Sequence, residues 1–492
     1  MIRLQQAIRW QILTFAALFP AGIPHWCPGP TTPYSMKPSL LRLYRQEIRI
    51  SLKLSYPIVI AQIGSVLMNV AANMMVGKQG AAAIASVGIG NSIYILVAVV
   101  GMGTLSVLSP QVATARGRND IEECRGLLQT AIGLSILIGL ILAAVLLGLV
   151  AVFHIFRQEP EVTRLAGNYL TITSLSTIPM MFFMGLKSFT DGLSYTRVAM
   201  VITLTGLALD IFLNWTLIYG NLGMPPLGVN GAGVAVLVTR IYMAVAMFVY
   251  LRTSPVFRLY WQKFSGPIRP LVNRVVRLGL PGGFQYFFEV GAFSGSAVMA
   301  GWIGTAQLAA HEIAISLAAL AYMVAAGNAS AGSIRVGEAV GRGSRSAIIR
   351  AGTVAIVIAI GFMSLTCLLF VTANVQLVSL YIQDASVLPI ATSLLIIAGI
   401  FQISDGVQVA SLGILRALSD VNIPTVVTLF AYWVIGIPLG YWLTFSLGYG
   451  VEGIWYGLLA GLTASATLLT ARFYVVSRRV NLHRVKTLEM KV

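Results

Sequence analysis

Four acidic side chains fall within or at the edge of long apolar stretches of this 492-residue sequence. They are Asp210, Glu289, Glu312 and Asp405. A carboxylate at the centre of a bilayer costs several kcal/mol unless it is solvated, paired or protonated, so each is a candidate functional group. Burial favours the neutral form of a carboxylate, and a nearby cation favours the charged form. Such a group can therefore exchange a proton, a sodium ion or a cationic molecule in competition, which is the chemistry that antiport requires.

Glu289 and Asp405 are the strongest candidates for a cation-coupling pair. Glu289 lies midway along its apolar stretch, and the stretch around Asp405 also contributes Gln402. Two carboxylates with a neutral oxygen donor can assemble a cage for Na+, whereas a proton needs one acid. The coupling ion is therefore expected to be Na+ or H+, with a slight preference for Na+ at Glu289 and Asp405.

Asp210 and Glu312 allow more than one interpretation. Asp210 could pair with Arg240, the one basic residue inside a predicted span, or cap a kink, or take part in coupling. Glu312 lies beside His311 near one end of its stretch, which favours an interfacial position.

Aromatic and methionine side chains near these acids also have two interpretations. Tyr286 and Phe288 flank Glu289 on the N-terminal side. A methionine cluster lies earlier in the chain, at Met180, Met181 and Met184. At helical spacing such residues usually pack, but they can also form a soft wall that binds flat cations through cation–π and thioether contacts. Tyr286, Phe288 and Gln402 are therefore candidate residues of a substrate cavity.

The sequence contains no pattern for covalent or hydrolytic chemistry. The four histidines form no H-E-x-x-H pair, and no phosphate-binding G-x-x-x-x-G-K-[ST] occurs. The three cysteines, Cys27, Cys124 and Cys367, are scattered and give neither a disulfide framework nor a C-x-x-C pair. We therefore expect no enzyme, no organic cofactor and no metal other than a coupling Na+.

Composition places the chain in a membrane. Hydrophobic residues make up 57% of it, charged residues 10%, and the mean hydropathy is +0.84. A soluble domain would carry about 25% charge, so a soluble enzyme, a nucleic-acid-binding domain and a disordered chain are excluded. Apolar runs of about 20 residues predict twelve transmembrane helices. They lie near residues 54–76, 83–108, 127–153, 166–186, 198–219, 232–251, 279–301, 306–332, 351–373, 387–413, 424–446 and 453–475.

The basic residues predict the orientation of these helices. Lys78, Arg157 and Arg164 are the basic residues of one set of loops. Apart from Arg240, all other Lys and Arg residues fall in the termini and the loops of the opposite side. The positive-inside rule then predicts a multi-pass protein of the bacterial inner membrane with both termini in the cytoplasm. The +17 net charge is thus explained by loops rather than by nucleic acid.

The N-terminal 50 residues require separate treatment. Residues 1–50 are expected to form a cytoplasmic arm, of which 1–35 is dispensable or untranslated because translation can begin at Met36. A chain starting at Met36 should therefore fold and transport normally, and loss of either would contradict this prediction.

An internal repeat predicts the architecture. Shifting the chain by 224 residues aligns Pro57 with Pro281, Gly77 with Gly301 and Gly117 with Gly341, among other pairs. A six-helix repeat returns the chain to the same side, so the two halves should be related by a pseudo-two-fold axis along the membrane normal. The predicted fold is an all-α membrane protein of two six-helix lobes. The predicted divisions are an N-lobe at 51–251, a cytoplasmic linker at 252–277, a C-lobe at 278–476 and a basic tail at 477–492.

Several stretches resemble the multidrug and toxic compound extrusion (MATE) family, in particular its NorM-like bacterial branch. They are RLGLPGGFQYFFEVGAF (277–293), AAHEIA (309–314), SIRVGEAVGRG (333–343), FQISDGVQVASLGILRALSD (401–420), FTDGLSYTRVAMVI (189–202), LNWTLIYG (213–220) and GVNGAGVA (228–235). The resemblance covers nearly the whole chain from about residue 45. It implies a Na+- or H+-coupled antiporter that exports lipophilic cationic drugs by alternating access. It also maps the family's C-lobe carboxylates onto Glu289 and Asp405, and we expect a monomer.

The N-lobe departs from the family pattern. Ala72 stands where the family usually has a helix 1 aspartate, and Val236 stands at a common helix 6 threonine. Some members of the family have a cation site in the N-lobe. The residues at the corresponding positions of this sequence are Asp210 and Asn214, which are four residues apart and share a helix face. The resemblance therefore implies a depleted N-lobe site that Asp210 could partly restore.

Three other functions compete with drug export. A flippase for lipid-linked saccharides or peptidoglycan precursors of the same superfamily would need arginines facing its anionic lipid, and Arg240 alone lies in a predicted span. An intramembrane acyltransferase or protease would need a nucleophile or a metal cluster. A purely structural membrane protein would leave Glu289 and Asp405 unexplained.

Overall fold

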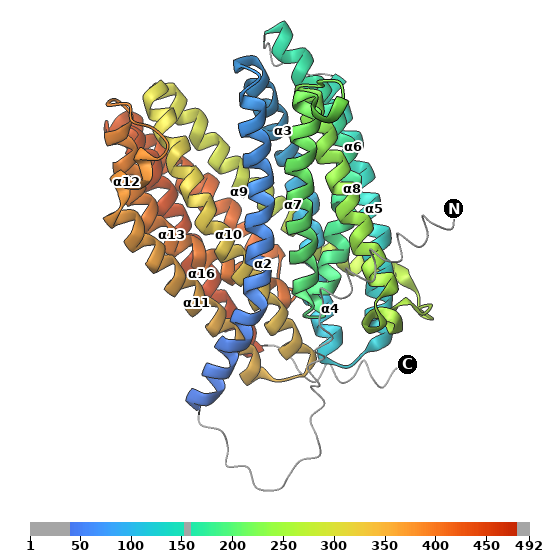
Figure 1. Cartoon of the computed structure of the whole chain (residues 1–492). Helices are drawn as coiled ribbons and strands as arrows, with labels where there is room; N and C mark the ends of the chain where they lie inside the picture. Colours follow the sequence, from blue (N-terminus) through green and yellow to red (C-terminus); the bar gives the residue numbers. More distant parts are fainter. Residues whose placement is uncertain (1–39, 152–158, 480–492) are drawn as a thin grey trace. The chain divides into compact units, whose positions relative to one another are not determined.

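Long helices joined by short turns make up almost all of the structure, a computed structural model that describes residues 40–151 and 159–479. By its internal contacts the chain divides after Leu43. The bundle belongs to residues 44–492, and helix α2 alone extends back across that boundary (Figure 1). The predicted start at Met36 and most of the basic tail lie outside the described residues.

The first half of the chain supplies six of the predicted spans. Their helices are α2 (Leu40–Gly77), α3 (Ala81–Ser106) with its continuation α4 (Leu108–Gly117), α5 (Ile121–Ala151), α6 (Pro160–Gly192), α7 (Thr196–Tyr219) and α8 (Val229–Thr253). Tight turns separate them where a residue takes a positive φ, as at Gly80 (112°) and Gly220 (75°). The short helix η2 (Asn221–Gly223) lies between α7 and α8.

The second half repeats this order. Its helices are α9 (Ile268–Ile303), α10 (Thr305–Gly341), α11 (Arg345–Thr372), the short α12 (Asn374–Ser379), α13 (Leu388–Ala417), a broken span made of α14 (Asn422–Leu429), η4 (Phe430–Gly436), α15 (Ile437–Tyr441) and η5 (Trp442–Ser446), and α16 (Val451–Arg479). In η4 and η5 the backbone bonds follow the wide π-helical pattern. Such turns re-aim side chains and are frequent at functional sites.

Helices and predicted spans agree in number and differ at their ends. Eleven of the long segments are apolar enough to cross a membrane, and α9 completes the predicted twelve. Helix α9 is the less apolar one because it carries Gln285, Glu289 and several glycines. The basic lead-in before residue 54 continues α2 as helix, and the predicted linker 252–277 holds η3 (Pro255–Trp261) and the start of α9.

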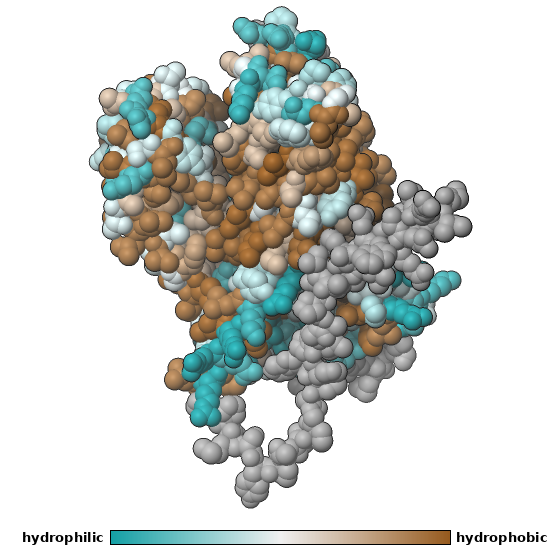
Figure 2. Space-filling view, viewed as in Figure 1, coloured by the Kyte–Doolittle hydropathy of each residue, from teal (hydrophilic) through white to brown (hydrophobic). Residues whose placement is uncertain are grey.

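Each half has its own apolar core. The larger core cluster of the first half includes Leu105, Leu128 and Phe189, and that of the second half includes Tyr432 and Trp455. Apolar side chains also cover the middle of the visible surface, and hydrophilic side chains gather towards its two ends (Figure 2). That distribution is expected for a bundle whose outer surface faces lipid.

Glycines let the two halves approach closely. Helix α3 packs on α9 and α4 packs on α10. A Cβ atom on Gly103 would lie 2.7 Å from the carbonyl oxygen of Gly282, so no larger residue fits without a shift. Farther along, Gly341 lies against Gly117. Since these two glycines are equivalent in the 224-residue repeat, their contact is what a pseudo-two-fold axis between the lobes requires.

Candidate functional site

The two predicted C-lobe acids both lie inside the bundle. Glu289 on α9 and Asp405 on α13 are each 5% exposed. Their carboxylates are close enough for the charges to interact. In the part of the chain that the structure describes, neither carboxylate has a basic group within 4.0 Å, and the side chain of Gln285 interacts with Glu289. Arg416 acts on Glu289 from farther away.

Hydroxyl and amide groups surround this pair, which we call the C-lobe acid pair. Tyr322 on α10 and Tyr432 on η4 both lie within electrostatic reach of the two acids. Tyr432 is fully buried and accepts a hydrogen bond from Nε2 of Gln408 at 3.2 Å. Gln402 is also fully buried, and neither atom of its amide has a partner. The oxygen atoms of these groups can complete the shell of a small cation, whereas the Gln402 amide nitrogen can only donate a hydrogen bond.

Sequence reasoning found the acids and Gln402 but missed Tyr322 and Tyr432. An acid inside an apolar run is conspicuous because charge is rare there. A tyrosine in such a run looks like packing, and only the wide turns of η4 bring Tyr432 inward while Trp433 stays 42% exposed.

The N-lobe candidates also lie together. Asp210 on α7 is 2% exposed, and Nδ2 of Asn214 donates to its carbonyl oxygen and to Oδ2, each at 2.9 Å. Oδ1 of Asn214 has no partner. Thr239 on α8 is buried beside Asp210 and interacts with its carboxylate through the side-chain hydroxyl. Thr239 was missed in the sequence, where the helix 6 threonine position was assigned to Val236, about one turn earlier.

Helix α2 contributes no acid here. Ala72 is buried at 7% exposure, and the neighbouring Asn73 is exposed, so Asn73 does not take the place of the missing aspartate. The N-lobe site thus has one carboxylate, the Thr239 hydroxyl beside it and the unpartnered Oδ1 of Asn214.

Asp210 and Arg240 do not form an ion pair, contrary to one interpretation of the sequence. Nη1 of Arg240 instead donates to the hydroxyls of Tyr94 at 2.5 Å and of Ser176 at 2.6 Å. The guanidinium carbon lies 4.6 Å from the centre of the Tyr94 ring, a cation–π contact. These neutral partners hold Arg240 in place without cancelling its charge.

The two candidate aromatic residues lie in different surroundings. Nη1 of Arg416 donates to the Tyr286 hydroxyl at 3.2 Å, and the Tyr286 ring abuts Gly103 where the lobes meet. Phe288 stacks on Phe284, with ring centres 6.3 Å apart, on a different face of α9 from Glu289. Tyr286 therefore lies on the interface between the halves, whereas Phe288 belongs to an outer aromatic group.

Glu312 is exposed, as an interfacial position requires. Its neighbour His311 is 1% exposed and packs edge-on against Trp455, with ring centres 5.7 Å apart. The carboxylate at 312 thus points away from the core that holds His311.

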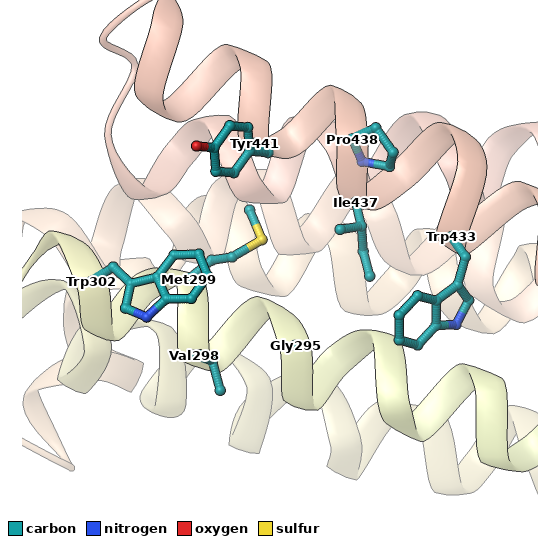
Figure 3. A pocket seen from close by; sticks show the side chains of 8 residues that line it. All are labelled: Gly295, Val298, Met299, Trp302, Trp433, Ile437, Pro438 and Tyr441. Carbon is teal, nitrogen blue, oxygen red and sulfur yellow. The ribbon is translucent and has the colours of Figure 1, made fainter.

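An apolar pocket of about 500 Å³ lies between α9 and the broken span (Figure 3). Its wall consists of Gly295, Val298, Met299, Trp302, Trp433, Ile437, Pro438 and Tyr441. None of the candidate acids lines it. The pocket and the C-lobe acid pair are therefore separate features that share α9.

Comparisons with known proteins agree with this arrangement. The MatE family model matches residues 57–216 and again 281–442. The two matches begin 224 residues apart, the offset of the internal repeat. A probable multidrug resistance protein NorM of Rhizobium meliloti is 34% identical, covering 88% of this chain and 95% of the relative. The multidrug resistance protein NorM of Burkholderia vietnamiensis is 32% identical, covering 86% and 93%.

Solved structures share the fold at lower identity. The eukaryotic MATE transporter AtDTX14 superposes with a TM-score of 0.82 at 20% identity, covering 90% of this chain and 99% of that one. A multidrug resistance MATE family transporter of the MOP superfamily in an outward-facing conformation gives 0.80 at 20% identity, covering 90% and 100%. These likenesses establish the two-lobe fold.

Proposed function

This chain belongs to the MatE family, and on that premise we propose that it is a cation-coupled antiporter of lipophilic, cationic drugs. It exchanges Na+ or H+ for the drug by alternating access between its two lobes. The relatives named NorM multidrug resistance proteins support drug export. The coupling mechanism rests on the chain's own residues.

The observation that carries the proposal is the C-lobe acid pair. Two buried acids without a contacting base cannot both stay ionised in a low-dielectric interior. Each state of the transporter must therefore supply a proton, a Na+ or a cationic group to neutralise them. When an incoming ion takes that place, the drug loses its counter-charge and is released. The same carboxylates thus couple the entry of the ion to the export of the drug.

The surroundings of the pair favour a small ion as one of the competitors. Gln402 and the hydroxyls of Tyr322 and Tyr432 offer neutral oxygen atoms beside the acids. They suit Na+, while protonation of one acid serves equally well for H+. The Asp210–Asn214 group is a second, weaker cation site in the N-lobe.

Orientation follows from the basic residues. We place both termini and the basic loops in the cytoplasm and the protein in the bacterial inner membrane, as a multi-pass monomer with lipid around it. The drug would then leave through the side that carries Lys78 and Arg164.

Efflux from proteoliposomes under separately imposed Na+ and H+ gradients tests the proposal. We expect one of the two gradients to drive ethidium uphill and the membrane potential alone to drive it far less. If neither gradient moves ethidium or any member of a broad cation panel, drug antiport is refuted. Movement of a lipid-linked saccharide in the same vesicles would then establish the flippase alternative.

A further inference from the structure

Arg240 is an unusual charge for its position. It lies midway along the transmembrane helix α8, and its side chain is half-buried. A guanidinium in a membrane helix is costly and normally finds a counter-charge. Within the described residues no carboxylate oxygen lies within 4.0 Å of Arg240. The nearby Asp210 uses its Oδ2 to accept from Asn214 instead.

The hydrogen bonds of Arg240 leave one edge of the guanidinium free. Both bonds, to Tyr94 and to Ser176, use Nη1. Within the described residues Nε and Nη2 have no acceptor, and each keeps some of its surface exposed. These two nitrogens form the side-on edge that binds a carboxylate with two parallel hydrogen bonds.

Elsewhere in the protein, the Nε–Nη2 edge of another arginine binds a carboxylate. Arg472 uses Nε and Nη2 to hold Asp420, at 2.7 Å and 3.2 Å from its two oxygens. Arg240 presents the equivalent edge without a protein partner. Tyr94 and Ser176 fix the opposite side of the guanidinium, so little side-chain freedom is lost when an anion binds.

We propose that the free edge of Arg240 is an oxyanion subsite that binds the carboxylate of amphoteric substrates in the N-lobe. The proposal deepens the drug-export function and rests on it, because it names a substrate class for that transporter. Asp210 lies near enough for its charge to interact with Arg240. One lobe therefore offers a negative and a positive group, which match the ammonium and the carboxylate of a zwitterion. A purely cationic drug would leave Arg240 empty.

A matched pair of dyes separates the two groups. Rhodamine 19 carries a free carboxylate, and rhodamine 6G is its ethyl ester, a cation of nearly the same shape. Fluorescence polarisation with the purified full chain gives a Kd for each dye. We expect Arg240→Gln to weaken rhodamine 19 binding about tenfold or more, since a bidentate, charge-assisted contact is lost. Rhodamine 6G binding should change less than about twofold, and its retention shows that the variant is folded.

Two further variants complete the design. Arg240→Lys keeps the charge but loses the paired donors, so it should retain rhodamine 6G binding and lose part of the preference for rhodamine 19. Arg164→Gln removes a positive charge from an exposed position and should leave both dyes unaffected. Equal effects of Arg240→Gln on the two dyes, or no effect on rhodamine 19 in either Arg240 variant, would overturn the subsite.

Transport of the same dyes distinguishes this inference from the proposed function. If the wild-type chain binds rhodamine 19 through Arg240 but moves neither dye under any gradient, the subsite stands and drug export fails. If it exports rhodamine 6G while Arg240→Gln leaves rhodamine 19 binding and export unchanged, drug export stands and the subsite fails.

Discussion

At the scale of single residues, the proposed exchange depends on buried charges and on what neutralises them. Glu289 and Asp405 are two interacting acids with one distant base, Arg416, whereas Asp210 is a single acid with Arg240 nearby. A mobile cation is therefore needed more in the C-lobe than in the N-lobe. The sequence could reveal these acids because each interrupts an apolar run. It could not reveal Thr239, Tyr322 or Tyr432, because a hydroxyl in such a run acquires a role only from neighbours on other helices.

Replacing either C-lobe acid by its amide should abolish coupled transport. Glu289→Gln and Asp405→Asn keep volume and hydrogen bonding but remove the titratable charge. Because a neutral amide is cheaper to bury, expression and thermal stability should be largely preserved. Gradient-driven ethidium efflux and a melting curve measure the two effects. Glu312→Gln, at an exposed carboxylate, is the matched control and should transport normally.

Asp210→Asn should have a milder effect than either C-lobe variant. The substitution leaves Asn214 without a charged acceptor but also leaves Arg240 in place on its two hydroxyls. We expect reduced but measurable gradient-driven efflux in the same vesicle assay. Complete loss of efflux in this variant would place the main exchange site in the N-lobe.

At the scale of helices, function depends on how closely the lobes meet and how they part. The glycine-lined contacts of α3 with α9 and of α4 with α10 hold backbones together without interlocking side chains. Ion pairs join helices of the two halves as well, near the predicted cytoplasmic side. Helix positions and the repeat followed from apolar runs and glycine spacing. The π-helical turns in η4 and η5 could not be predicted in this way, because they change the backbone hydrogen-bond pattern and leave no mark in the composition.

A methyl group at Gly103 should weaken the lobe contact. The new Cβ would overlap the carbonyl oxygen of Gly282, the Cα of Gly283 and the Tyr286 ring, each at 2.7 Å. Overpacking of this kind costs about 1–3 kcal/mol. Gly103→Ala should therefore lower the melting temperature or shift the chain towards a state with parted lobes. Gly133→Ala, where nothing lies within 4 Å, is the control. Equal behaviour of the two variants in melting and efflux would argue against a tight contact.

Three interhelical ion pairs, formed by two acids, should hold the lobes together like a latch on the predicted cytoplasmic side. Arg335 and Arg350 lie 2.7 Å and 3.6 Å from the Glu47 carboxylate, and Arg274 lies 2.5 Å from Glu123. Both sets join one half of the chain to the other. Glu47→Gln with Glu123→Gln should favour the state open on that side, because partly buried bases lose their acids.

Labelling of cysteines introduced along α4 and α10 reports the latch. The double variant should label faster with a membrane-impermeant maleimide added from that side. Charge reversal at one pair, Glu123→Arg with Arg274→Glu, should restore only part of the wild-type rate, because Arg118, which also pairs with Glu123, then faces an arginine. Unchanged labelling in the double variant would show that the pairs do not control opening.

At the scale of the whole molecule, one duplicated unit has been used twice with different chemistry. The repeat places Gly117 against Gly341 and starts both MatE matches 224 residues apart. The lobes nevertheless hold different charges, with two acids and the more distant Arg416 in the C-lobe and one acid with a separated base in the N-lobe. We infer that the C-lobe acid pair exchanges the coupling ion for the cationic drug and that the N-lobe adds the subsite for a substrate carboxylate. The sequence alone could support the first half of this division, since Ala72 replaces an acid. The second half required the contacts of Arg240.

The most direct test of that division is gradient-driven ethidium efflux by the Glu289→Gln, Asp405→Asn double variant in proteoliposomes, measured beside Asp210→Asn and the wild-type chain. We expect the double variant to show no uphill efflux under either a Na+ or an H+ gradient, and Asp210→Asn to retain part of the wild-type rate. Near-normal gradient-driven efflux by the double variant, together with complete loss in Asp210→Asn, would contradict a C-lobe exchange site.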